Sequence, residues 1–173
     1  MSARAALAVR DAMVAWVDAH HREEVAFLRE IVRVPSDTPP GDNAPAAEKA
    51  AALLERLGHR VERHPVPASL LRDYGMKSVT NLIVRHRFGA GGPTIALNAH
   101  GDVVPPGEGW TKPPYEGVIE GGRMFARGVA VSKSDIASYT FALEALRTAE
   151  RAGAGFRGTV ELHFTYDEEF GGL

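Results

Sequence analysis

Hydrophobic positions in the first third of the chain recur at three- and four-residue steps. This spacing places them on one face of a helix and predicts a helical region that ends at Pro35 and the loop 36–43. A second helix is predicted after Asn43, with Pro45 in its first turn and Gly58 at its left-handed end. The apolar positions behind these predictions are Val14, Val17, Phe27, Leu28, Ile31 and Val32 in the first region, and Leu53, Leu54 and Leu57 in the second.

Further along, the pattern becomes typical of strands. Residues 79–84 and 94–98 predict two strands, and the second is an apolar run that we expect to be covered on both faces. Residues 116–126 predict a hairpin, and residues 132–151 predict a helix. The last strand, 159–166, alternates, with Val160, Leu162, Phe164 and Tyr166 on one face. Helices interleaved with short apolar strands predict an α/β fold.

Composition excludes several classes of function. The 173 residues carry 20 basic and 22 acidic side chains, for a net charge of -2, so we expect no nucleic-acid partner. The absence of cysteine excludes disulfides, thiolate catalysis and cysteine-based metal sites. No apolar run approaches the ~20 residues that cross a bilayer, and no signal-peptide pattern is present. We therefore expect a soluble, cytoplasmic protein with no membrane partner.

The first candidate for chemistry is His100-Gly101-Asp102, directly after a predicted strand. Residues two apart in extended chain point to the same side, so His100 and Asp102 share a face. A metal-bound imidazole usually donates its other N–H to a carboxylate, and this spacing suits that arrangement. The alternative is a surface turn with a solvated histidine.

The second candidate is Asp167-Glu168-Glu169, at the end of the last predicted strand. Adjacent side chains on extended chain point in opposite directions, so we expect only one of Glu168 and Glu169 to bind a given ion, while the other faces elsewhere. Three neighbouring carboxylates repel one another unless a cation lies among them. A solvated acidic turn is the alternative.

A third stretch joins the hairpin to the helix that begins near Ser132. Ser132 or Ser134 is expected to cap this helix, and Asp135 then lies in its first turn, where the helix dipole favours a carboxylate. Capping alone is a sufficient explanation of Asp135.

Taken in order, these motifs are His-Gly-Asp-Val-Val-Pro, Gly-Trp with Pro-Pro-Tyr, Gly-Gly-Arg with Ala-Arg-Gly, and Asp-Glu-Glu-Phe-Gly-Gly. Together they resemble the N-terminal half of the catalytic domain of the M20 metallopeptidases, which include deacylases, desuccinylases and carboxypeptidases. The resemblance runs from about Ile31 to the last residue. It implies a mixed sheet flanked by helices, as in zinc exopeptidases.

The resemblance also implies roles. His100 matches the family's histidine ligand of one zinc ion, and Asp102 matches the aspartate that orients this histidine. Glu168 matches the glutamate that acts as general base, and Glu169 matches the carboxylate ligand of the other zinc ion. Members hydrolyse an amide with one or two zinc ions, and cobalt or manganese are possible replacements.

One motif departs from the family pattern Arg-Gly-Ala-x-Asp-x-Lys-Gly. Aligned on Arg127 and Lys133, the aspartate that bridges both metals in the family is replaced by Val131, which cannot bind a metal. Our hypothesis is that Asp135, four residues on, supplies this metal ligand. The competing view is that the bridge is lost and the site is mononuclear or inactive.

Family members run to roughly 400 residues, so the resemblance implies that residues 1–173 are the N-terminal portion of the catalytic domain, without the lid and dimerisation domain. We expect a full-length form to be a homodimer and this portion to be a poor hydrolase alone.

The leading function is therefore a metal-dependent hydrolase that cleaves an amide bond in a small peptide or an N-acyl amino acid. The alternative is a catalytically inactive fragment or relative, acting as a non-enzymatic α/β module. Trp110 and Tyr115 either lie at the edge of the substrate cleft or only pack against neighbouring side chains. His59, His64 and His86 lie in or beside predicted strands with no carboxylate pattern around them, so we expect no functional role for these histidines.

Overall fold

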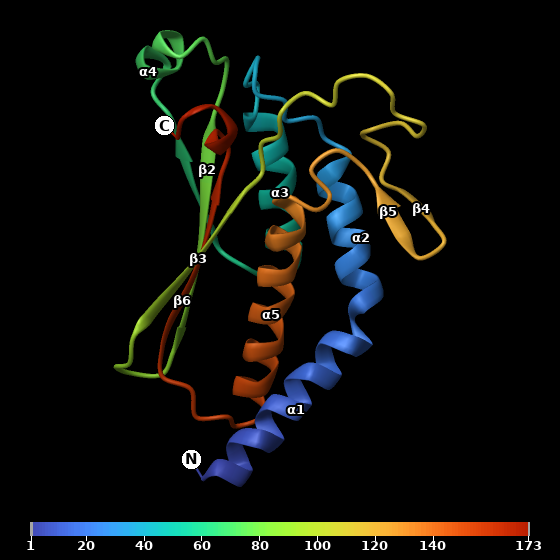
Figure 1. Ribbon diagram of the computed structural model, residues 1–173. Coiled ribbons are helices and arrows are strands. Elements are labelled where there is room, and N and C mark those ends of the chain that lie inside the picture. The colour runs from blue at the N-terminus through green and yellow to red at the C-terminus, as the bar shows by residue number, and fades with distance from the viewer. Residues whose placement is uncertain (1, 173) are drawn as a thin grey trace.

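The computed structural model describes residues 2–172, which form a four-stranded sheet with helices packed along one face (Figure 1). The strands lie in the order β1-β2-β6-β3. β6 pairs with β3 in parallel, whereas β2 pairs with both β1 and β6 antiparallel. The sheet is therefore mixed, and the expected α/β fold is confirmed. The four strands are β1 (Val61–Pro65), β2 (Thr80–Phe88), β3 (Thr94–His100) and β6 (Gly158–Thr165).

The core lies between the sheet and the two helices that contact it, α3 and α5. Leu82 and Val84 of β2 and Leu162 and Phe164 of β6 are buried here, as the alternation of these strands requires. Helices α1 and α2 pack against α5. The helices are α1 (Ala3–Ala19), α2 (His21–Val32), α3 (Ala44–Arg56), the short α4 (Ala68–Asp73) and α5 (Lys133–Arg151).

The hairpin is confirmed as β4 (Val118–Glu120) and β5 (Arg123–Phe125), joined by a turn with positive φ at Gly121 and Gly122. Gly58 also has a positive φ, 82°, after the end of α3, as predicted. None of the described helices combines the length and the apolar character that a membrane span needs.

Two predictions about the elements are wrong. The helical first third is broken at His20, whose backbone (φ -106°, ψ 14°) leaves the helical region, and Val14 on α1 is exposed rather than buried. β3 is not covered on both faces, because the helices pack along one face of the sheet (Figure 1) and Ile95 of β3 is 54% exposed. The prediction also missed β1 and α4 and ended β2 too early.

Candidate metal centre

The candidate site lies where β3 and β6 end together. Because these two strands are parallel, their carboxyl ends meet at one edge, and His100 pairs in register with Thr165. The Gly101 amide then donates to the Thr165 carbonyl at 2.8 Å. Gly101 is required here by close packing, since a Cβ atom on it would lie 2.4 Å from the ring of Tyr166. The two candidate motifs are thus placed side by side.

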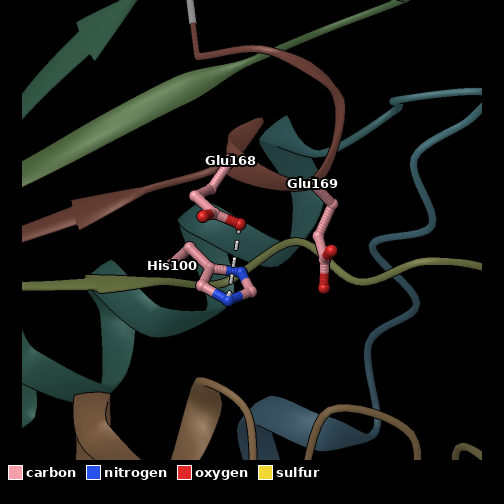
Figure 2. Close-up of side chains that lie close together, drawn as sticks. All are labelled: His100, Glu168 and Glu169. Atoms are coloured by element: carbon pink, nitrogen blue, oxygen red, sulfur yellow. Dashed lines mark ion pairs between the residues drawn. The ribbon is translucent and has the colours of Figure 1, made fainter.

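His100, Glu168 and Glu169 form the candidate cluster (Figure 2). One potential ligand atom from each lies within 4.8 Å of the other two, and His100 Nε2 is 3.8 Å from Glu168 Oε2. Glu168 and Glu169 extend from the short 3₁₀ helix Glu168–Phe170 (η1), with the His100 ring below them in the view of Figure 2. Among the described residues, this is the one group of this kind.

Asp102 holds both parts of the cluster in place. Its side chain is fully buried, and its Oδ1 and Oδ2 accept the backbone N–H groups of Glu168 and Glu169 at 3.2 and 3.1 Å. His100 Nδ1 lies 3.0 Å from the Asp102 carbonyl oxygen and 3.4 Å from its Oδ1. Both neighbours are acceptors, so Nδ1 carries the proton and the Nε2 lone pair faces the glutamates. The hydrogen bond to Asp102 raises the pKa of His100.

The donor set fits a divalent metal ion. An imidazole with its Nε2 lone pair aimed at two carboxylates is a nitrogen and oxygen set of the kind that binds catalytic zinc. The side chain of His100 is largely buried, whereas that of Glu168 is 60% exposed and accessible to a substrate. The structure brings His100, Glu168 and Glu169 together, so the expectation that only one of the two glutamates can face a given ion is wrong: both lie on a 3₁₀ helix and not on extended chain. The roles of these residues and of Asp102 stay predictions.

Asp135 lies outside this cluster. Its carboxylate accepts a hydrogen bond from Ser132 Oγ at 2.9 Å in the first turn of α5, as the dipole interpretation places it. The expected serine cap is wrong: Ser132 occupies the N-cap position without a side-chain capping bond, and Ser134 Oγ donates back to the Ala130 carbonyl. The prediction that Asp135 binds a metal stays a prediction.

A cavity of about 270 Å³ adjoins the cluster, with Glu169 as part of its wall. Val131, which is 65% exposed, and Trp110 also line this cavity, so Trp110 lies at the edge of the site. Tyr115 instead donates a hydrogen bond to Asp37, and burial together with this bond raises its pKa. The remaining wall is formed by Val103, Ala126, Arg127, Gly128, Val129 and Ala130.

Lys133 is a buried basic residue whose charge interacts with those of Asp37 and Asp102, and its motif alone indicated no such role. It is 2% exposed, and its Nζ donates to the Val34 carbonyl at 3.3 Å. Burial lowers its pKa to about 8, while the charges of Asp37 and Asp102 oppose that shift. Its position at the start of a helix, three residues before the next core position, Ile136, gave no signal of burial.

The sequence around His59, His64 and His86 indicates no carboxylate pattern, yet the structure places a carboxylate near each of them. His59 Nε2 lies 3.1 Å from Glu144, His86 Nε2 lies 2.9 Å from Glu150, and His64 Nε2 lies 3.5 Å from Glu62. The first two partners come from α5, which no local pattern around the histidines could reveal.

Comparison with known proteins agrees with the motif resemblance. The peptidase family M20/M25/M40 matches residues 96–173. The chain is 35% identical over 148 residues to the succinyl-diaminopimelate desuccinylase of Gluconobacter oxydans, covering 85% of this chain and 35% of that protein. It is 39% identical over 147 residues to the enzyme of the same name from Acidiphilium cryptum, covering 85% and 34%. The chain thus spans about a third of the length of the curated relatives it matches.

Solved structures share the fold. The di-peptidase Dug1p of Saccharomyces cerevisiae superposes with a TM-score of 0.70 at 18% identity, covering 92% of this chain and 35% of that one. An M20 family metallo-carboxypeptidase of Sulfolobus solfataricus superposes with a TM-score of 0.66 at 23% identity, covering 85% and 31%. Both likenesses therefore concern the architecture described above.

Proposed function

Because this chain belongs to the M20 peptidase family, we propose that it carries the metal-binding part of a hydrolase that cleaves an amide bond. The substrate class is a small peptide or an N-acyl amino acid, and the desuccinylase relatives favour the second. Residues 1–173 are the N-terminal portion of the catalytic domain in this proposal. The observation that carries it is the convergence of His100, Glu168 and Glu169 at the shared end of β3 and β6.

His100 Nε2 and a Glu169 oxygen would each be a metal ligand, either for one divalent ion between them or for two neighbouring ions, with zinc the expected metal. Such an ion supplies Lewis-acid polarisation of the amide carbonyl and lowers the pKa of water. The hydrogen bonds that Asp102 accepts from the His100 ring and from the backbone amides of Glu168 and Glu169 hold these residues in position before substrate binds. The proposed ligand set is completed by Asp135, since catalytic zinc usually has three protein ligands.

Glu168 is the proposed general base. It is the most exposed of the three side chains in the cluster, so a substrate amide and a water molecule can reach its carboxylate. Glu168 accepts the proton of the attacking water and returns it to the leaving amine nitrogen, so that a neutral amine departs.

Hydrolysis of N-succinyl and N-acetyl amino acids by the zinc-loaded protein tests the proposal, with Glu168→Gln as the comparison. We expect a loss of at least a hundredfold in kcat for Glu168→Gln, with zinc still bound, because proton transfer typically contributes 10²- to 10⁴-fold. Turnover that survives in Glu168→Gln would overturn the role of Glu168.

Bound zinc in Asp135→Ala tests the third ligand. The proposal expects reduced occupancy, and unchanged occupancy would remove Asp135 from the ligand set. The same result would favour the inactive α/β module, whose support is Val131 at the position where the family resemblance expects a carboxylate.

A further inference from the structure

The loop 36–43, which joins α2 to α3, lies at the end of the sheet where the candidate cluster is found (Figure 1). Its first residue pairs with the segment after β3, since the Val103 amide donates to the Ser36 carbonyl at 2.9 Å. Its last residue pairs with the segment before β2, since the Asn43 amide donates to the Ser78 carbonyl at 2.8 Å. The loop is therefore attached beside β3 and beside β2, the two strands that flank β6.

Ser36 holds the backbone on the histidine side of the cluster. Its side chain is fully buried, and its Oγ donates to the Gly101 carbonyl at 2.7 Å. Gly101 stands between His100 and Asp102, and its own amide donates to the Thr165 carbonyl. The residue that follows the histidine is thus held from two directions, by the loop at its carbonyl and by β6 at its amide.

Asn43 holds the backbone on the glutamate side. Its side chain is also fully buried, and its Nδ2 donates to the Tyr166 carbonyl at 2.7 Å and to Thr38 Oγ1 at 2.8 Å. A backbone carbonyl only accepts, so the amide nitrogen of Asn43 must face Tyr166. Tyr166 stands two residues before Glu168, and the bond therefore fixes the chain just ahead of both glutamates.

The two donor bonds also explain why an asparagine occupies this position. The Asn43 Oδ1 is buried and has no hydrogen-bond partner in the part of the chain that the structure describes. Such an acceptor is unfavourable, and an apolar side chain would avoid it. Helix capping does not account for the residue either, because Asn43 makes no side-chain capping bond to α3. The contribution of the side chain thus lies in its amide nitrogen.

We propose that Ser36 and Asn43 are positioning residues for the metal cluster, and that the 36–43 loop sets how far His100 lies from the two glutamates. The inference rests on the proposed function, because it concerns the same metal ligands. Neither residue belongs to the cluster itself. Metal–ligand distances are fixed to within about 0.2 Å, so a small displacement of one strand end relative to the other weakens binding.

Calorimetric titration of the metal-free protein with zinc at pH 7 measures this effect. We expect Ser36→Ala to weaken zinc binding at least threefold and Asn43→Ala at least tenfold, since the first loses one donor and the second loses two. Thr140→Val is the matched control. Thr140 is fully buried and its Oγ1 donates to the Ile136 carbonyl at 2.7 Å within α5, so this variant loses a comparable bond outside the loop. It should bind zinc within twofold of the wild type.

The double variant Ser36→Ala with Asn43→Ala tests whether the two residues act through one loop. Residues that act together show non-additive effects. Once the loop is released at one end, its bond at the other end fixes less, so the combined loss of zinc affinity should be smaller than the product of the two single losses. A combined loss equal to that product would overturn their joint action through the loop.

Amide hydrogen exchange in the metal-free protein separates this inference from the proposed function. The Glu168 and Glu169 amides donate to Asp102, so their exchange reports on opening of the segment after β6. Relative to amides within α5, Asn43→Ala should speed their exchange at least tenfold, and Thr140→Val should not. This comparison within one molecule distinguishes local release from a general loss of stability.

Unchanged exchange in Asn43→Ala, or zinc affinities of both single variants equal to that of the wild type, would overturn the inference and leave the proposed function standing. Faster exchange in Asn43→Ala together with no zinc binding by the wild type would reject the proposed function, while the hold of the loop on the glutamate segment would stand. Spectra of the variants with native dispersion exclude misfolding as the cause.

Discussion

Asp102→Asn is the substitution that most directly tests how the site is held together. The change keeps the shape of the side chain but replaces one carboxylate oxygen with an amide nitrogen. In the structure both oxygens accept backbone N–H groups, one from Glu168 and one from Glu169. An asparagine can accept only one of them, and its own N–H₂ then faces the other amide.

The expected cost follows from those contacts. A hydrogen bond to a buried charged group contributes roughly 1.5–3 kcal/mol, and the buried N–H left without an acceptor costs a further ~1–3 kcal/mol. We therefore expect Asp102→Asn to lower the free energy of unfolding by about 3 kcal/mol or more, which is a large share of the ~5–15 kcal/mol of a typical domain. Loss of a partner behind a metal-bound histidine also lowers metal affinity, by about 10- to 100-fold.

Urea unfolding at pH 7 with EDTA present measures the first effect, and zinc titration the second. Asp73→Asn is the matched control, because Asp73 is exposed and is expected to change stability by no more than about 0.5 kcal/mol. The reasoning is refuted if the unfolding free energies of Asp102→Asn and Asp73→Asn agree within that margin.

Three further outcomes are expected. Gly101→Ala should lower the free energy of unfolding by about 1–3 kcal/mol in the same assay, because the new methyl group would meet the Tyr166 ring; a stability equal to wild type would contradict this. Burial raises the pKa of Glu144, but the neighbouring His59 and Arg147 together lower it by more, so that the pKa lies below its ordinary value. The carboxylate is thus favoured in the folded state, so the stability advantage of wild type over Glu144→Gln should be present at pH 7 and fade as the pH falls below about 4.5 in urea unfolding at several pH values; an advantage that grows on acidification would be the wrong sign. Val131→Asp should raise the number of zinc ions bound in equilibrium dialysis without loss of fold, since Val131 is exposed in the cavity beside Glu169; unchanged stoichiometry would exclude this position as a metal-binding one.

The spacing of apolar residues predicted the helices and strands that bury one face against the core. α3, α5 and β6 have apolar positions at regular intervals, and the structure buries them as the spacing requires. β1 escaped notice because its five residues, Val-Glu-Arg-His-Pro, are mostly polar on a strand that pairs on one side only. The apolar run of β3 was misinterpreted because hydrophobicity alone does not reveal whether a second layer covers the other face of the sheet, and here the helices lie along one face (Figure 1).

The candidate residues could be recognised as motifs in the sequence, but their spacing along the chain did not predict that they lie close together in the fold. His100 and Glu168 are brought together by the parallel pairing of β3 with β6, a long-range contact that the family resemblance implied and the residues alone did not. The double role of Asp102 toward the Glu168 and Glu169 amides, and the burial of Lys133, depend on how the loops cross and could only be found in three dimensions.

The central claim is that His100 and the two neighbouring glutamates bind a divalent metal, and calorimetric titration of the metal-free protein with zinc at pH 7 tests it most directly. The account predicts saturable binding that His100→Ala weakens at least tenfold, while the control His64→Ala, a half-exposed histidine beside Glu62, leaves it unchanged. Absence of saturable binding, or equal affinities in wild type and His100→Ala, would contradict the account.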